Sequence, residues 1–308
     1  MTRPEHAPRP ENPNDRRGIV LALAAASGLG LAVAVSRIAY DGGTNGLTVA
    51  MVRGLLMLVG LYIFCRLSGR KVGLSPRDHL HCLGLGVLMA AAFYGNVGSV
   101  EFIPVGLSAL LFFTFPPMVA VIQMIVVREA IPLPKVAALS IAFTGVATML
   151  GASLSNSDPF GIGLALGAAA CVAWSSVWVM RKLRHIDPLV LTFNMASVAA
   201  VLLCVVTIGA DQVQAPNTPS GWLSLAIVVG LQACSIPLYY AAIPRIGALK
   251  SAMVSNVQPL VSILAAFALY QELLSPTQFA GGIAVLGAVI WMQHFDRQHP
   301  SRNARLTA

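Results

Sequence analysis

The chain has 308 residues, of which 56% are hydrophobic and only 10% are charged, and its mean hydropathy is +0.76. A soluble domain carries roughly 25% charged residues, so this composition excludes an ordinary soluble protein. The formal net charge of +8 would suit a nucleic-acid partner, but the positions of the charges along the chain argue against one.

Ten apolar runs follow one another along the chain. Each is close to, or longer than, the roughly 18 residues that an apolar helix needs to cross a bilayer. A helix is the favoured spanning structure because lipid offers no partners to free backbone N–H and C=O groups. We interpret residues 1–17 as a disordered tail and residues 294–308 as a second tail. The predicted transmembrane helices lie near residues 18–39, 47–65, 80–101, 105–127, 134–152, 160–180, 188–208, 220–241, 248–270 and 276–293.

Lys and Arg residues are distributed asymmetrically between these runs. If the N-terminus lies in the cytoplasm, only Arg37 of the 20 basic residues falls on the far side, and only Arg53 falls inside a span. This is the positive-inside pattern, in which cytoplasmic loops are rich in Lys and Arg. It predicts a protein integral to the plasma (inner) membrane with both termini and both tails in the cytoplasm. It also explains the net charge without nucleic acid.

The chain resembles itself at one fixed offset in residue number (161 − 18 = 143). Gly18–Ala26 reads GIVLALAAA and aligns with Gly161–Ala169, which reads GIGLALGAA. Pro116 aligns with Pro259, and each opens a Pro-x12-Glu stretch. Matches of Ala and Leu are common by chance in an apolar chain, but a shared Pro and a shared Glu at one offset are not. The sequence therefore predicts an internal repeat.

Five predicted helices in each repeat give the two repeats opposite orientations. Because five is odd, residues 18–152 and residues 160–293 enter the membrane from opposite sides. Inverted repeats recur in secondary transporters, where two similar halves exchange conformations and open a central site to alternate sides. The predicted fold class is an all-α integral membrane protein with ten transmembrane helices in two inverted five-helix repeats.

The pattern of Ser-Ala, Pro-x12-Glu and Gly in the fourth and fifth runs returns in the ninth and tenth. It resembles the EamA family of the drug/metabolite transporter superfamily, and Arg53 also occupies what looks like a family position. The resemblance covers residues 16–293 and implies ten helices, two repeats and both termini inside. It also implies transport driven by ion gradients and not by ATP. It leaves the substrate open, since such transporters move amino acids, nucleobase-like metabolites, cofactor precursors and drugs.

Pro116 and Pro259 are predicted to kink the fourth and ninth helices. Proline lacks an N–H group and frees a carbonyl one turn earlier. Membrane helices tolerate this where neighbours or a cavity satisfy the freed group. We expect the two kinks to shape a central cavity; the alternative is a pair of packing kinks that never meet substrate.

Polar and aromatic side chains inside the spans are the candidates for substrate binding. A charge such as that of Arg53 is costly in a span unless it faces protein or water. Arg53 is thus a candidate partner for an anionic substrate group, and the alternative is an anchor to the outer headgroups. The other candidates lie in runs that line the cavity of the transporters that this chain resembles, and each could instead bond to a neighbouring helix. They are Tyr94, Asn96, Phe113, Trp174, Tyr239, Asn256 and Gln258.

Three carboxylates stand at the ends of predicted spans. Glu101, Glu129 and Glu272 are candidate acids for proton coupling. The alternative is that each is an interfacial carboxylate that pairs with a nearby cation or favours the start of the next helix.

The function expected from these features is secondary active transport of a small metabolite or drug by alternating access. We expect an exporter, with import as the alternative. A receptor or scaffold without transport is the alternative from another class, although the short loops leave no domain for signalling. An enzyme is not expected, because the spans hold no paired acids, His cluster or Ser-His pair. We expect no cofactor and no metal site, since the five cysteines are not spaced as ligands. The expected partners are a small-molecule substrate and the lipid bilayer.

Overall fold

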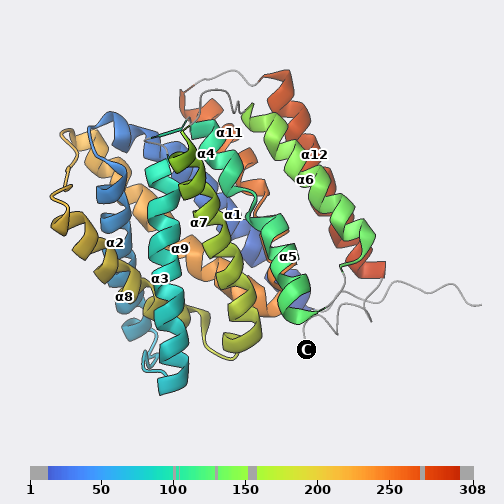
Figure 1. Cartoon of the computed structure of the whole chain (residues 1–308), viewed down its shortest axis with the longest axis horizontal. Coiled ribbons are helices and arrows are strands. Elements are labelled where there is room, and N and C mark those ends of the chain that lie inside the picture. The colour runs from blue at the N-terminus through green and yellow to red at the C-terminus, as the bar shows by residue number, and fades with distance from the viewer. Residues whose placement is uncertain are drawn as a thin grey trace, which may run out of the picture.

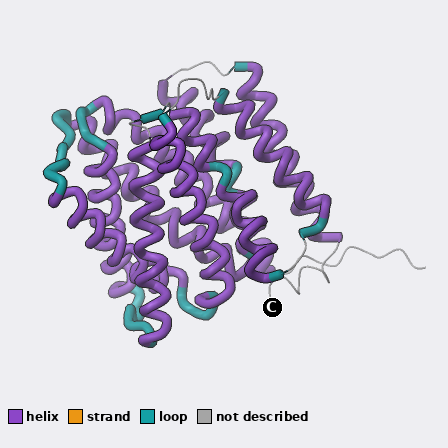
Figure 2. The backbone as a smooth tube through the Cα atoms, viewed as in Figure 1, coloured by secondary structure: helices purple, strands orange, loops and turns teal. Residues whose placement is uncertain are grey.

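The computed structural model describes residues 13–99, 102–103, 105–128, 131–151, 158–270 and 275–298, and this part of the chain is built from helices without a strand. The helices lie side by side in a bundle, with loops at its two ends (Figures 1 and 2). In chain order they are α1 (Pro13–Asp41), α2 (Gly46–Leu67), α3 (Pro76–Gly98), α4 (Val105–Phe112), α5 (Phe115–Val127), α6 (Leu133–Leu150), α7 (Pro159–Trp178), the π-helix η2 (Val179–Leu183), α8 (Pro188–Gly209), α9 (Pro219–Ile246), α10 (Ala248–Val254), α11 (Val257–Tyr270) and α12 (Pro276–Gln298).

Three helices of the second half begin at an Asp-Pro or Thr-Pro pair. Side-chain oxygens of Asp158, Asp187 and Thr218 accept hydrogen bonds from backbone N–H groups in the first turns of α7, α8 and α9. The proline that follows each cap fits the first turn, where its missing N–H would have no helical partner. These local signals explain why the three helices start within one residue of the predicted runs.

Eight of the described helical segments are long and apolar enough to cross a membrane. The two predicted spans outside this set are α3, whose first turns carry Asp78, His79 and His81, and α6, whose apolar stretch Leu133–Thr148 is shorter. The long apolar helices support an integral membrane protein. The number of ten crossings remains a prediction.

Two of the predicted spans are each divided into two helices. The run at 105–127 is α4 followed by α5, and the run at 248–270 is α10 followed by α11. The sequence predicted one kinked helix in each place, whereas the structure ends one helix and begins another just before Pro116 and Pro259. A proline fits the first turn of a helix and removes a backbone hydrogen bond in its interior, so a break on the N-terminal side of Pro116 and Pro259 places each in a first turn. The helix α9 is continuous although it contains Pro237 and Pro244.

The main helix pairs join the two halves of the chain. α1 packs against α9 and α11, and in the same way α7 packs against α3 and α5. α2 packs against α8, and α6 packs against α12 at one side of the bundle (Figure 1). If each helix is replaced by its equivalent in the other half, each of these pairs becomes another of them or stays the same pair. The packing therefore has the symmetry of the repeat.

Two glycine contacts show this symmetry in atomic detail. A methyl group on Gly18 in α1 would lie 2.6 Å from Ile246, and a methyl group on Gly161 in α7 would lie 2.9 Å from Ile103. The two glycines differ in number by the repeat offset (161 − 18 = 143), and so do the two isoleucines (246 − 103 = 143). The offset found in the sequence therefore relates packed pairs in three dimensions.

The bundle has a proximal end, where α1 begins and α9 ends, and a distal end, where α1 ends and α9 begins. At the distal end the side-chain N–H of Asn45 donates to the Gln212 carbonyl at 2.8 Å. At the proximal end the Arg70 guanidinium donates to the Asp187 carboxylate. The offset from Asn45 to Asp187 equals the offset from Arg70 to Gln212 (187 − 45 = 212 − 70). Equivalent positions of the two halves thus form a neutral hydrogen bond at the distal end and an ion pair at the proximal end.

Candidate functional site

The two helix interruptions bring irregular backbone into the interior of the bundle. Residues 113–114 separate α4 from α5, and residues 255–256 separate α10 from α11. Beside them, the Thr114 hydroxyl donates to the Leu111 carbonyl at 2.6 Å, and the Gln258 N–H donates to a carbonyl of the second interruption at 2.9 Å. Irregular backbone at membrane depth is tolerated only inside protein or beside a water-filled cavity. The surroundings of both interruptions are therefore candidates for a substrate-binding site.

Asn256 stands in the second interruption and is the clearest candidate for a ligand contact. It is 1% exposed, and its Oδ1 atom has no hydrogen-bond partner. A buried polar atom without a partner costs about 1–3 kcal/mol, which a donor on a bound molecule would recover. Gln258 is partly exposed, and its backbone packs so closely on α1 that a methyl group on Gly30 would lie 2.5 Å from the Gln258 carbonyl oxygen.

Phe113 stands in the first interruption and is buried among aromatic rings. Its ring centroid lies 5.8 Å from that of Phe112 and 6.3 Å from that of Phe115. Pro116 follows in the first turn of α5 and is also buried. The first interruption is thus filled with rings, whereas the second places an amide in the interior.

Arg53 is partly buried in α2, and an aromatic ring holds its charged group. Its Cζ atom lies 3.9 Å from the ring centroid of Phe93 in α3. A cation over an aromatic face gains about 0.5–2 kcal/mol, with the larger value in desolvated surroundings. Because Phe93 is itself buried, the guanidinium faces the interior of the bundle, where the predicted anion partner would have to lie.

Tyr94 and Asn96 lie, partly buried, in the last turns of α3 towards the distal end. The Ser99 hydroxyl, which follows α3, contacts the Asn96 carbonyl at 3.2 Å and lies 2.6 Å from the Ser108 hydroxyl of α4. These contacts bring the end of α3 next to the first half of the interrupted α4–α5 pair.

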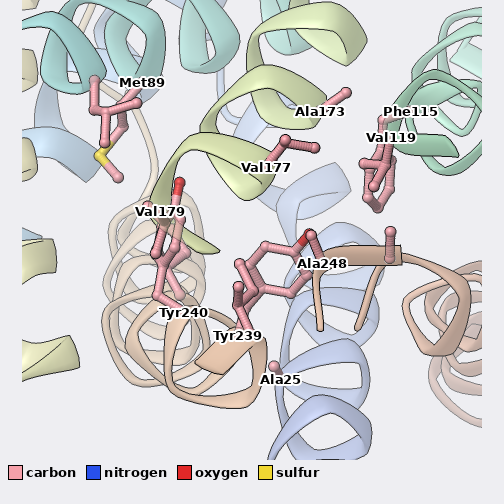
Figure 3. Close-up of a cluster of buried hydrophobic side chains, with 14 of the residues drawn as sticks. Ala25, Met89, Phe115, Val119, Ala173, Val177, Val179, Tyr239, Tyr240 and Ala248 are labelled. Atoms are coloured by element: carbon pink, nitrogen blue, oxygen red, sulfur yellow. The ribbon is translucent and has the colours of Figure 1, made fainter. Parts of the chain in front are cut away.

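Tyr239 is buried in α9 and bonds to α7. Its hydroxyl lies 2.8 Å from Ser176 Oγ. Since the Ser176 hydroxyl donates to the Val172 carbonyl, the Tyr239 O–H donates in the shared bond. The rings of Tyr239 and Tyr240 meet edge to face with centroids 5.6 Å apart. Figure 3 shows Tyr240 beside Val179, and Tyr239 between Val177 of α7 and Ala248 of α10.

Trp174 is not brought together with these residues. It lies two positions from Ser176 on α7, which corresponds to about 200° around a helix. Ser176 faces Tyr239 in the interior, so Trp174 faces outward. It is 42% exposed and stacks on Trp178 with centroids 5.9 Å apart. We therefore leave Trp174 out of the candidate site.

Two glutamines with buried side-chain oxygens were missed by the sequence reasoning. The Oε1 atoms of Gln123 in α5 and Gln232 in α9 are buried and have no hydrogen-bond partner. Both stand in predicted spans, where any amide needs a partner, and that was the signal that could have found them. The three candidate acids Glu101, Glu129 and Glu272 lie outside the described residues.

A groove with a volume of about 350 Å³ lies apart from these residues, between α6 and α12. The hydroxyls of Ser140, Thr144 and Thr148 line it from α6, and each donates to the carbonyl four residues earlier. Their hydrogen-bonding capacity as donors is therefore already used within α6.

Comparisons with known proteins agree with the architecture. A family model described as the EamA-like transporter family matches residues 16–151 and again residues 159–293. One solved structure, described only as the crystal structure of a protein, superposes with a TM-score of 0.74 at 16% sequence identity, covering 92% of this chain and 98% of the other. At that identity the likeness establishes the fold alone. A search of curated protein sequences found no match.

Proposed function

The chain belongs to the EamA-like transporter family of the drug/metabolite transporter superfamily, and from this premise we propose that it is a secondary active transporter working by alternating access. Its substrate is a small metabolite or drug, and the net direction is export. The plasma (inner) membrane holds it with both termini in the cytoplasm.

One structural observation supports this proposal in addition to the family match. The interrupted pairs α4–α5 and α10–α11 occupy equivalent places in the two halves, and the second interruption holds the unpartnered amide oxygen of Asn256. Transporters with inverted repeats bind substrate near the bilayer midplane, at helices that are discontinuous for this purpose. A packing role for Asn256 would favour a partner for that oxygen, and a binding role explains why it has none.

The proposed substrate chemistry follows from the side chains that face the interior. The guanidinium of Arg53 would bind a carboxylate or another anionic group, because its fork of N–H donors matches such groups. Asn256 Oδ1 would accept from an N–H or O–H group. Tyr94, Phe113 and Tyr239 would provide flat apolar surface. A small zwitterionic or polar molecule with an apolar body fits this set.

The first test is counterflow into liposomes that contain the purified protein. A mixed pool of amino acids, nucleosides and common drugs is offered, and the exchanged compounds are identified by mass spectrometry. Selective exchange of one class supports transport and names the substrate chemistry. Absence of exchange in a gradient of protons and in its absence, from protein that elutes as a folded species, would support a receptor or scaffold instead.

A matched pair of variants then tests the role of Arg53. Arg53→Gln removes the charge above Phe93, whereas Arg66→Gln removes an exposed charge near the end of the same helix. Hydrogen bonds to charged groups contribute about 1.5–3 kcal/mol, so Arg53→Gln should lower exchange of an anionic or zwitterionic substrate by roughly tenfold or more. Arg66→Gln should leave it unchanged. Equal effects would remove Arg53 from the site.

Export and import are separated by the orientation of the membrane. Everted vesicles expose the cytoplasmic face, so an exporter accumulates labelled substrate inside them when a gradient is applied. An importer accumulates substrate in vesicles of the native orientation.

A further inference from the structure

The interrupted helices pack differently at the two ends of the bundle. At the proximal end α5 packs against α10. The repeat relates this pair to α4 and α11 at the distal end, and the described residues of those two helices form no comparable contact. If the two halves adopted identical conformations, both pairs would pack alike. The structure is therefore asymmetric along the bundle axis.

Burial of equivalent residues gives the same result. Ala252 in α10 is 0% exposed, while Ala109, its equivalent in α4 (252 − 143), is partly exposed. Met253 is likewise buried and its equivalent Leu110 is partly exposed. Protein covers α4 less completely than α10, so the proximal end is the more tightly packed end.

A hydrogen bond inside the protein closes the proximal end further. The Tyr239 hydroxyl donates to Ser176 Oγ at 2.8 Å and thereby ties α9 to α7. In Figure 3, Tyr239 lies beside Ala248, the first residue of α10, and above Ala25 of α1. All three residues belong to one hydrophobic cluster. The tyrosine therefore occupies the space where α1, α7, α9 and α10 come together.

The two equivalent positions at the distal end cannot form this bond through their side chains. The repeat relates Tyr239 to Asn96 of α3 (239 − 143) and Ser176 to Val33 of α1 (176 − 143). Valine has no hydroxyl group, so a side-chain hydrogen bond of this kind cannot form between the equivalent positions. The Tyr239–Ser176 hydrogen bond is therefore particular to the second half, and it lies towards the proximal end, where α5 packs against α10.

We propose that the Tyr239–Ser176 hydrogen bond is the closing contact of a gate at the proximal end. The gate consists of Tyr239, Ser176 and the seam between α5 and α10. Tyr239 acts by keeping the proximal path shut, and its bond to Ser176 breaks whenever the path opens to that side. This inference rests on the proposed alternating access, but its test needs no substrate.

The test measures how fast a charged maleimide modifies a single cysteine. The background replaces Cys65, Cys82, Cys171, Cys204 and Cys234 by serine or alanine. Ala252→Cys reports on the proximal seam, and Ala109→Cys is the matched reporter at the distal end. With wild-type Tyr239, Ala252→Cys should react much more slowly than Ala109→Cys.

Loss of the bond should open the gate more often. Tyr239→Phe and Ser176→Ala should each raise the modification rate of Ala252→Cys by about fivefold, the factor that corresponds to a typical net hydrogen bond. The double variant should add nothing, because both single changes remove the same bond. Tyr62→Phe, which removes the hydroxyl of an exposed tyrosine in α2, should leave the rate unchanged.

Two results would overturn the gate. One is an unchanged rate at Ala252→Cys in both single variants, with protein that still elutes as a folded species. The other is a rate increase by Tyr62→Phe as large as that by Tyr239→Phe. If Ala252→Cys fails to fold, Met253→Cys serves as the reporter. Counterflow is measured separately. Faster labelling of Ala252→Cys without any substrate exchange would support the gate and contradict the transport proposal. Substrate exchange with an unchanged labelling rate would contradict the gate alone.

Discussion

The two ends of the bundle are built from equivalent elements of the repeat, but the contacts at the two ends differ. The loop contact that is a neutral bond from Asn45 to Gln212 at the distal end is an ion pair of Asp187 with Arg70 at the proximal end. The half-helices that pack at the proximal end do not pack in the same way at the distal end. The difference shows that the repeat fixes where helices lie, while individual side chains decide how firmly each end is held.

A substitution where α1 crosses α11 should have the largest effect on the stability of the protein. Gly30→Ala would place a methyl group 2.5 Å from the Gln258 carbonyl oxygen and 2.9 Å from Val261 Cβ. At the equivalent crossing of α7 over α5, Ala173 already holds a buried methyl group. Overpacking costs about 1–3 kcal/mol, so Gly30→Ala should lower the apparent melting temperature in detergent.

The control for this change is Gly163→Ala in α7. A methyl group there would meet no atom within 4 Å, and alanine is favoured over glycine in a helix. Its melting temperature should stay the same or rise. Similar losses in both variants would mean that the loss at Gly30 does not come from its close packing on α11.

Asn256→Ala should separate function from stability. The change removes a buried oxygen that has no partner, so the free energy of unfolding should rise, or fall by no more than about 1 kcal/mol. Exchange of substrate should nevertheless drop by about fivefold or more, because the proposed acceptor is lost. Counterflow and thermal unfolding are measured on the same preparation.

The matched amide is Asn194 in α8, whose side-chain N–H groups donate to the Val72 and Val190 carbonyls. Asn194→Ala should lower stability by about 1 kcal/mol, since satisfied hydrogen bonds are lost. Its substrate affinity should not change. A loss of stability without loss of exchange in Asn256→Ala would contradict the binding role.

The ion pair at the proximal end should respond to salt, and the neutral bond at the distal end should not. A double-mutant cycle with Arg70→Gln and Asp187→Asn should give a coupling of about 0.5 kcal/mol at low salt, because both side chains are partly exposed. The coupling should fall as NaCl rises from about 0.05 M to about 0.5 M. The stability lost in Asn45→Ala should be the same at both salt concentrations.

The smallest expected effect concerns Asp78 at the proximal end. The hydroxyl of Ser75, and then His185, lower the pKa of the Asp78 carboxyl below its ordinary value of 3.8. A carboxyl with a lowered pKa stabilises the folded state above its unfolded pKa and loses that contribution as pH falls through the folded pKa.

The measurement for Asp78 compares the wild-type protein with Asp78→Asn. The difference in melting temperature should be constant above about pH 5 and shrink below about pH 4. A difference that is already lost well above pH 5 would contradict the assignment to the Asp78 carboxyl.

The sequence predicted the architecture well because an internal repeat is a pattern of spacing. The offset that aligns Gly18 with Gly161 also relates their packing partners in the structure. The sequence could not predict the outward direction of Trp174, because a helix that is apolar all round gives no sign of which face is inside. The sequence identifies Gln123 and Gln232 as amides inside spans, but only the structure shows that their oxygens have no partner. The asymmetry between the two ends depends on packing and leaves no periodic signal.

The pairing of helices across the two halves has a consequence for how the protein is made. α1 is synthesised first, yet its contact at Gly18 is with Ile246, the last residue of α9. Because α1 packs mainly on α9 and α11, it has to wait in the bilayer as an inserted but unpacked helix. Each hydrophobic cluster of the described residues combines side chains from both halves. We therefore expect the protein to assemble as two complementary fragments joined by the segment between α6 and α7. Cutting that segment and producing the two fragments together should still yield the folded bundle, whereas either fragment alone should be degraded.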